Sequence, residues 1–498
     1  MKIFAKTTAA LFAALLTFSA IFTACADGGA TPADTTAAAA PDAATTEAEV
    51  STRLESGLVG QPDYGGYDYN IYLHGAHWVN DFKGEEQNGE VINDAQYERT
   101  AKVEELYNVK ISYKEFFSVD NRGGQQNVLK SVAAGSNDYD IAVMSGYSCC
   151  NAVTSNILRN LNTVPNLELS MPWWDQYANS DFAFGDKLFM TTGDISTADN
   201  ASTYCIYFNK KMAENFGLPN LYEKVDTMQW TIDNLKSYTV GVYEDTDGDG
   251  SGENDKDDTY AIYIWDDIMM GIVNASGIKC CEVNADGHIE LTLYSDRFVS
   301  VFEQFASFAF DKSITCAYQR NGYDADYGQI ALREDRALFL LQHLGTITTL
   351  REMDTDFGVL PLPLFSEDQE RYYNSSASWT SAFYTIPNNA FDDEGFARTG
   401  YILQALAYES LYTLTPAYYE ITLKGKTTRD EESSAMLDLI FSTRSYDYGW
   451  YFEIGGYNEG IMNLLRSYST NVASMYEKGL KKAEKLLDKI NAAVDEIG

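Results

Sequence analysis

Hydrophobic and polar positions alternate along the first part of the chain as they do in an open α/β sheet. Residues 67–74 alternate and predict a strand, and residues 93–107 then repeat apolar side chains at helical spacing behind Asn93, a residue that can cap a helix. The next predicted elements are a strand, a helix and a strand, over residues 109–113, 126–134 and 139–144. Strands and helices in strict alternation predict a parallel sheet with right-handed crossovers.

Two apolar runs near the middle of the chain, residues 187–191 and 203–209, predict two strands joined through a polar turn. Strand and helix patterns continue on both sides of them, so the chain is expected to cross here from one lobe to another. At 498 residues the chain can form two lobes, because single hydrophobic cores stop growing near ~250–300 residues.

The pattern after the predicted crossing continues with strands and helices. Residues 331–345 have the small and aliphatic side chains of a buried helix or strand, and residues 357–363 predict a return crossing to the first lobe. A polar loop then carries Trp379 into a strand that ends at Pro387. Helices are predicted over residues 295–311, 393–412 and 472–497, the last of them amphipathic with lysines on its polar face.

The N-terminus has the form of a secretory signal. Lys2 and Lys6 precede an apolar run over residues 9–22, which is too short to span a membrane. The sequence FTAC, ending at Cys25, resembles a lipobox and would make Cys25 the lipidated first residue of a bacterial lipoprotein. Ordinary signal cleavage nearby, with Cys25 a stray thiol, is the alternative. Residues 26–52 lack aromatic side chains and predict a disordered tether.

Charge and motif content exclude several functions. The net charge of −37 opposes binding to nucleic acid phosphates, and the sequence contains no HExxH, GxSxG or Walker motif. Besides Cys25, the cysteines form two adjacent pairs and two singles, a spacing that fits no metal site and leaves the question of disulfides open: Cys149, Cys150, Cys205, Cys280, Cys281 and Cys316.

An acidic loop follows the second lobe's first helices and predicts a calcium site. Asp245, Asp247 and Asp249 alternate and precede Gly250, which matches the front half of a calcium loop. Lys256 occupies the place of the closing glutamate, so the closing ligand has to come from Asp255, Asp257 or Asp258. The predicted ligands are Asp245, Asp247, Asp249, Ser251, Asp255 and Asp257. The alternative is an acidic surface turn, in which crowded carboxylates would repel one another without a cation.

Several short motifs, in this order along residues 60–498, resemble the bacterial extracellular solute-binding proteins of family 1, which serve ABC importers. They are WW at 173–174, YFNKKMAENFGL at 207–218, the acidic loop with its exit strand at Tyr260, FGVLPLP at 357–363 and KGKTTRDEES at 424–433. The resemblance implies an α/β, two-lobed, periplasmic-binding-protein-like type II fold with hinge crossings. The expected divisions are a signal peptide (1–24), a lipidated tether (25–58), lobe 1 (59–205 and 365–412) and lobe 2 (206–364 and 413–498).

The resemblance also implies a non-catalytic, monomeric receptor, anchored outside the cytoplasm, that passes a solute to an ABC permease in the membrane. The resemblance points to a carbohydrate ligand, with which aromatic rings that stack on sugars agree. The lack of a visible arginine cluster favours a neutral oligosaccharide. A peptide receptor of the same fold and a surface-anchored glycoside hydrolase remain alternatives. The candidate ligand contacts are the residues expected where strands and crossings meet the cleft: Trp78, Trp174, Asp175, Asp194, Trp265, Asp266 and Trp379.

Overall fold

The computed structural model describes residues 53–75, 82–118, 120–250, 255–350, 353–424 and 431–496. Residues 56–498 form one compact unit, which is the subject of this section. The predicted signal peptide and Cys25 lie outside the described residues, as do Trp78 and Ser251.

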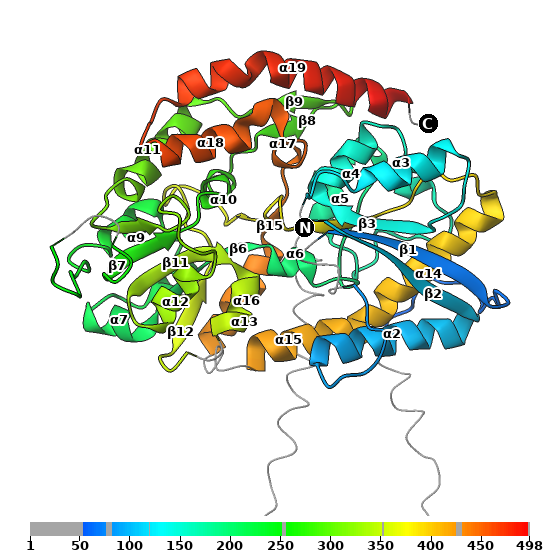
Figure 1. Ribbon diagram of the computed structural model, residues 1–498, viewed down its shortest axis with the longest axis horizontal. Coiled ribbons are helices and arrows are strands. Elements are labelled where there is room, and N and C mark those ends of the chain that lie inside the picture. The colour runs from blue at the N-terminus through cyan, green and yellow to red at the C-terminus, as the bar shows by residue number, and fades with distance from the viewer. Residues whose placement is uncertain are drawn as a thin grey trace, which may run out of the picture. The chain divides into compact units, whose positions relative to one another are not determined.

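The first lobe is built on a four-stranded sheet with the order β14-β3-β1-β2 (Figure 1). Its strands are β1 (Tyr67–Gly75), β2 (Val109–Phe117), β3 (Ile141–Ser145) and β14 (Ala382–Thr385). β1 pairs in parallel with both β2 and β3, which confirms the predicted parallel sheet. β14 arrives from much later in the chain and adds to β3 as an antiparallel edge strand.

Helices follow the strands of this sheet. They are α2 (Val91–Tyr107), α3 (Gln125–Ala133), α4 (Gly146–Val153), α5 (Gln176–Asp181) and α14 (Asp393–Tyr412). Of these, α2 connects β1 to β2, and α3 connects β2 to β3. The predicted cap at Asn93 was wrong, because α2 begins two residues earlier, and the amide of Asn93 instead donates to the backbone oxygen of Glu86. Gly135 follows α3 with a φ of 66°, a left-handed conformation that glycine adopts without strain and that ends the helix.

The second lobe is built on a five-stranded sheet with the order β10-β7-β11-β6-β12. Its strands are β6 (Tyr204–Asn209), β7 (Tyr260–Ile264), β10 (Thr315–Ala317), β11 (Ala337–His343) and β12 (Phe357–Leu360). β7 is parallel to β10 and β11, whereas β6 is antiparallel to β11 and β12. The predicted helix or strand over 331–345 is therefore a strand at 337–343, and its first six residues are buried, as expected for a strand covered on both faces.

Short helices surround this second sheet (Figure 1). They are α7 (Lys210–Asn215), α8 (Leu221–Asp226), α9 (Ile232–Ser237), α10 (Ile268–Ala275), α11 (Asp296–Ala309), α12 (Tyr327–Arg333), α13 (Ile347–Leu350), α16 (Glu431–Ser442) and α18 (Tyr457–Arg466). α11 confirms the predicted helix and buries Phe298, Phe302 and Phe305 on one face. The hydroxyl of Thr231 accepts from the backbone N–H of Asn234, which confirms the predicted cap of α9.

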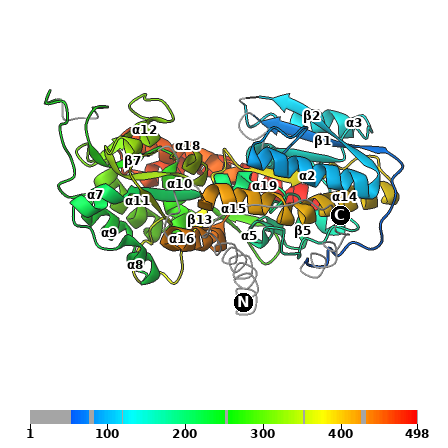
Figure 2. The same ribbon diagram turned by 90° about the horizontal axis from the view of Figure 1, so that it is seen from below.

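Three segments carry the chain between the sheets. The first contains α6 (Ala198–Ala201), and the second lies between β12 and β14. The third is α15 (Leu414–Lys424), which lies beside α2 and α14 before the chain enters α16 (Figure 2). One isolated bridge pairs the first two segments, Thr203 with Ser376, and another pairs Thr191 of the first segment with Tyr384 of β14. β13 (Asn374–Ser375) and β15 (Arg444–Ser445) add a short parallel pair.

The predicted strand over residues 203–209 is confirmed as β6, whereas the rest of the link over residues 187–209 differs from the prediction. The first strand, β5 (Lys187–Leu188), has two residues and pairs with β4 (Ala183–Phe184), while β6 pairs inside the second sheet. Residues 188–193 are all buried. The apolar run that suggested a longer strand is therefore a buried part of the segment that crosses between the lobes. A second small hairpin joins β8 (Cys281–Val283) and β9 (Ile289–Leu291).

The chain ends with α17 (Tyr448–Tyr451) and the long helix α19 (Val472–Glu496). As predicted, α19 is amphipathic, and its buried side chains include Ala483, Leu487 and Ile490. α19 contacts α18 of the second lobe and α4 of the first, so it runs along both lobes (Figure 1). Within the described ranges, no helix combines the length and apolar character of a membrane span.

The six cysteines of the described residues, two adjacent pairs and two singles, are buried free thiols. Burial raises the pKa of the Cys149 and Cys205 thiols, which keeps them protonated and chemically quiet at neutral pH. The question that the sequence left open is thus answered in favour of thiols over disulfides.

Candidate ligand-binding site

The candidate site lies where the carboxyl ends of strands from both sheets meet. In open α/β sheets, ligands bind beyond the carboxyl ends of the strands. Asn121 lies in the loop after β2, and its amide donates to the backbone oxygen of Trp379 at 2.8 Å. The indole N–H of Trp379 donates in turn to Asp267, three residues after β7, at 2.5 Å. Trp379 therefore links the carboxyl ends of strands from the two sheets.

Asp267 is the centre of this cluster, with 3 % of its surface exposed. Its Oδ2 accepts hydrogen bonds from the Tyr204 hydroxyl at 2.8 Å and from the Trp379 indole, and Nε2 of His343 lies 3.6 Å away. Burial alone would raise the pKa of Asp267, but His343 and the two hydrogen bonds outweigh it and hold the pKa below its ordinary value. Asp267 is therefore an ionised carboxylate in a buried position.

Asp266 lies beside it and is fully buried. Its Oδ2 accepts from Nε of Arg466 at 2.7 Å, and Arg466 also pairs with Glu459 at 2.9 Å. Burial raises the pKa of Asp266, and the opposing charges of Arg466 and Arg320 only reduce that shift. Trp265 completes this edge, with its ring 5.1 Å from the ring of Tyr318.

The first lobe contributes the loop between β2 and α3. The hydroxyl of Ser148 donates to the backbone oxygen of Asn121 at 2.8 Å and so fixes the loop to α4. Next to Asn121, the guanidinium of Arg122 donates to both carboxylate oxygens of Glu453, with Nε to Oε2 at 2.9 Å. Arg122 also lies 4.8 Å from the ring centre of Tyr147. Arg122 and Glu453 therefore compensate each other's charge.

Proteins of known structure identify the fold, whereas sequence comparison does not. No protein-family model matches the sequence, and no curated protein matches it. An ABC substrate-binding protein from Listeria monocytogenes in complex with cycloalternan superposes with a TM-score of 0.52 at 10 % identity, over 86 % of this chain and 99 % of that chain. The chain has the fold of ABC substrate-binding proteins.

Two further structures agree on the fold. A family 1 extracellular solute-binding protein from Bifidobacterium longum subsp. infantis gives a TM-score of 0.51 at 13 % identity, over 86 % of this chain and 99 % of that chain. A protein from Mycobacterium tuberculosis in complex with glycerophosphocholine gives 0.53 at 15 % identity, over 86 % and 99 %. Identities this low establish the fold alone, so the function has to be argued from the side chains.

In this binding-protein fold, three of the predicted contacts, Trp265, Asp266 and Trp379, lie in the cluster around Asp267. Sequence reasoning missed Asp267, Asn121 and Arg122. For Asp267 a signal was present, since it directly follows Trp265 and Asp266 at the carboxyl end of a strand whose five residues are all buried. Asn121 and Arg122 lie in a polar loop without a distinguishing pattern, and only the fold brings them to Trp379 and Glu453.

The structure places Trp174 and Asp175 in a different, buried environment. Only 2 % of Trp174 is exposed, and its indole donates to Gln404 of α14 at 3.0 Å. Asp175 caps α5, and its Oδ2 accepts from Arg444 at 2.9 Å and from the Tyr446 hydroxyl at 2.9 Å. These contacts give both residues roles in packing between crossing segments.

Asp194 belongs to the same hinge region, within the first crossing. It accepts a hydrogen bond from the Thr415 hydroxyl of α15 at 2.8 Å, and burial raises its pKa to about 7. Nearby, Asp199 pairs with Arg444 at 2.9 Å, and burial raises its pKa to about 6. Arg444 thus binds the carboxylates of Asp175 and Asp199 together and joins β15 to the first crossing.

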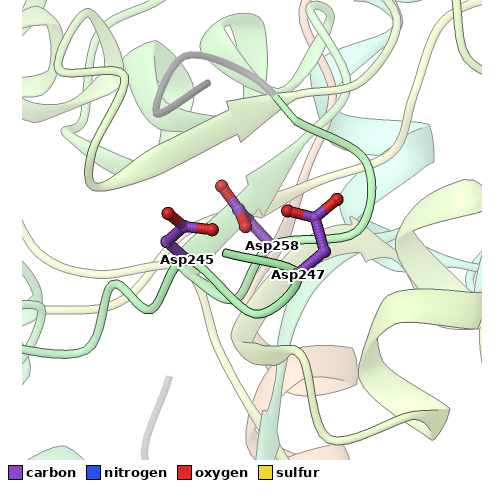
Figure 3. A group of neighbouring side chains, drawn as sticks. All are labelled: Asp245, Asp247 and Asp258. Atoms are coloured by element: carbon purple, nitrogen blue, oxygen red, sulfur yellow. The ribbon is translucent and has the colours of Figure 1, made fainter. Parts of the chain in front are cut away.

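Some of the predicted metal ligands lie close together in the acidic loop. Carboxylate oxygens of Asp245, Asp247 and Asp258 lie within 4.8 Å of one another (Figure 3), and those of Asp247, Asp255 and Asp257 form a second group. Asp249 lies in neither group. Asp258 was considered only as a possible closing ligand, and it is the buried member of the first group.

Local hydrogen bonds shape this loop. Asp245 accepts from the backbone N–H groups of Gly248 at 2.7 Å and Gly250 at 3.1 Å, and both glycines have φ near 70°, which turns the chain around the carboxylate. The backbone N–H of Asp249 lowers the pKa of Asp247, but lost solvation and the neighbouring carboxylates outweigh it and raise the pKa overall. The carboxylates therefore repel one another, and a cation would relieve this repulsion.

Proposed function

We propose that the protein is the substrate-binding component of an ABC importer, which captures a solute between its lobes by hinge bending and delivers it to a membrane permease. The observation that carries this proposal is the meeting of both sheets' carboxyl ends at Trp379 and Asp267, between lobes that three chain segments connect. Such connections allow two rigid lobes to open and close around a ligand.

The proposed ligand is a neutral oligosaccharide. The half-buried rings of Trp265 and Trp379 suit the apolar side of a sugar, and the carboxylates of Asp266 and Asp267 suit its hydroxyl groups. Contrary to the expectation from sequence, two arginines do come together at the site, since both Arg320 and Arg466 act on Asp266. The nearby carboxylates of Asp266, Asp267 and Glu459 offset the charge of the two arginines, so the preference for a neutral ligand is kept.

The remaining features of the proposal follow the sequence. The receptor would be monomeric, would act outside the cytoplasm, and would be anchored to the membrane through a lipid on Cys25. It would release its ligand chemically unchanged. Mass spectrometry of the intact secreted protein tests the anchor, since a diacylglyceryl group on Cys25 supports it and cleavage elsewhere contradicts it.

A thermal-shift screen tests the ligand class, with neutral oligosaccharides, uronate oligosaccharides and peptides as separate arms. We expect neutral oligosaccharides to raise the melting temperature of the wild type, because a ligand that binds only the folded state stabilises it. Trp379→Ala should reduce that shift. Stabilisation by peptides alone would favour the peptide receptor, and chromatographic detection of shortened oligosaccharides after incubation would favour a hydrolase.

We also propose that the acidic loop binds calcium as a structural ion. Asp245, Asp247 and Asp258 would supply carboxylate oxygens of the kind that calcium prefers, with Asp255 and Asp257 next to them. This set replaces the predicted one in part, because Asp249 stands apart from it. Calcium bound here would hold the loop against β7 of the second lobe through the buried Asp258.

A further inference from the structure

Two adjacent carboxylates at the candidate site share an unusual arrangement. Oδ2 of Asp266 is held by Arg466, and Oδ2 of Asp267 is held by Tyr204 and Trp379. The other oxygen of each, Oδ1, is buried and has no hydrogen-bond partner among the residues that the structure describes. In each carboxylate, one oxygen is thus held by protein donors, and the other, which we call the open oxygen, accepts no hydrogen bond from the described residues.

Asn121 repeats this arrangement from the opposite lobe. Its Nδ2 donates to the backbone oxygen of Trp379, and its Oδ1 is a buried acceptor without a partner in the described part of the chain. Because Trp379 contacts both Asn121 and Asp267, the acceptors belong to one continuous cluster. We call Asn121, Asp266 and Asp267 the acceptor triad.

Open buried acceptors are costly for a folded protein. Leaving one such group without a donor costs about 1–3 kcal/mol, and more when the group is charged. The triad gathers three of them where the fold's ligands bind. Donors supplied by a ligand would remove this cost, so the triad is built for a partner that donates hydrogen bonds.

The charges around the triad define that partner further. Arg466 pairs with Asp266 and Arg122 pairs with Glu453, so two nearby cations are already neutralised. Arg320 donates Nη1 to the backbone oxygen of Leu465, while its Nε and Nη2 have no partner among the described residues. A hydroxyl group satisfies both kinds of site, since it donates to a carboxylate and accepts from an arginine. A carboxylate or phosphate would satisfy Arg320 alone and would face two carboxylates.

We infer that the acceptor triad is the specificity determinant of the site: it binds neighbouring hydroxyl groups of the solute and rejects solutes that carry an anionic group at that position. This inference rests on the proposed solute-binding function. It assigns ligand contacts to Asn121 and Asp267 and gives Arg466, Tyr204 and Trp379 the role of orienting the two carboxylates.

Amide substitutions invert the polarity of the open atoms with little change in shape. In Asp267→Asn, the Tyr204 and Trp379 donors would hold the amide oxygen, which puts the NH₂ group where Oδ1 was. Arg466 does the same in Asp266→Asn. A hydrogen bond to a charged group contributes about 1.5–3 kcal/mol, so each variant should lose at least about tenfold in affinity. Glu459→Gln is the matched control, because Glu459 pairs with the same Arg466 but is exposed.

The experiment is isothermal titration of wild type and variants with maltotetraose, xylotetraose, tetragalacturonate and a mixed tetrapeptide library, after melting curves show that each variant is folded. The inference predicts that a neutral oligosaccharide binds, that tetragalacturonate does not, and that Asp266→Asn and Asp267→Asn weaken binding at least about tenfold while Glu459→Gln does not.

The other outcomes separate the two proposals. Neutral binding that both amide variants retain, or preferred binding of tetragalacturonate, overturns the triad and leaves the receptor function standing. Binding of peptides alone also overturns the triad and leaves the receptor function standing. Failure of every probe, with all variants folded, contradicts both the triad and the proposed solute.

Discussion

Asp194 gives the stability of the protein a pH dependence that one substitution should remove. Burial is the largest influence on this carboxyl group and raises its pKa from 3.8 to about 7, although the Thr415 hydroxyl donates a hydrogen bond to it. In an unfolded chain an aspartate titrates near ~3.9. Between about pH 4 and pH 7, the folded state therefore holds a proton that the unfolded state has released.

The sign of the effect follows from this proton. Because the pKa is higher in the folded state, the contribution of protonated Asp194 is fully present below about pH 4 and is lost as the pH rises to about 7. A difference of about three pKa units, at about 1.4 kcal/mol each, corresponds to about 4 kcal/mol in the free energy of unfolding. That is a large share of the typical stability of a folded domain, about 5–15 kcal/mol.

Asp194→Asn keeps an oxygen for the Thr415 hydroxyl but cannot ionise. We expect the variant and the wild type to have similar free energies of unfolding near pH 4, and the variant to be more stable by up to about 4 kcal/mol near pH 8. Urea unfolding followed by tryptophan fluorescence across this range measures the difference. Thr415→Val removes the hydrogen bond that favours the charged carboxylate, so the pKa of Asp194 in the folded state should rise. The free energy of unfolding of this variant should then continue to fall at a higher pH than that of the wild type. A difference between Asp194→Asn and wild type that is constant with pH would refute the reasoning.

Three further predictions concern the ion pairs of Arg444, the acidic loop and the buried thiols. Arg444→Met leaves the buried Asp175 and Asp199 without their common cation and should lower the free energy of unfolding by about 3–5 kcal/mol, with partial recovery in Arg444→Lys; equal stability in urea would contradict the hinge network. Chelation of calcium-loaded protein should lower its melting temperature, and Asp245→Asn should abolish that difference. A melting temperature that the chelator leaves unchanged would mean that the loop is only an acidic turn. The six buried thiols should react with a thiol reagent only after unfolding, and rapid reaction of native protein would place at least one of them at the surface.

Much of the fold could be predicted because long elements carry strong periodic patterns. The helices at 393–412 and 472–496 and the parallel strands β1, β2 and β3 lie where apolar spacing puts them. The prediction failed at the first crossing, because residues 189–193 are buried backbone outside any strand, and their side chains imitate a strand pattern. Burial alone makes these residues apolar, and whether they pair as a strand depends on segments that are far away in the sequence.

The site was harder to predict than the fold. Trp265 and Asp266 could be found because they directly follow a buried strand, but nothing local distinguishes the open oxygen of Asp267 from a solvated one. Trp174 and Asp175 have the same residue types as binding residues, and only their contacts with Gln404 and Arg444 show that they hold the crossings together. Contacts between residues more than two hundred positions apart decide such roles, and a local sequence pattern does not contain them.

The central claim is that the two lobes close on a solute held at Trp379 and Asp267. Small-angle X-ray scattering of the protein, alone and saturated with the oligosaccharide that titration identifies, tests it most directly. The account predicts a smaller radius of gyration for the saturated wild type and no such change for Asp267→Asn at the same oligosaccharide concentration. Identical scattering profiles for free and saturated wild type would contradict it.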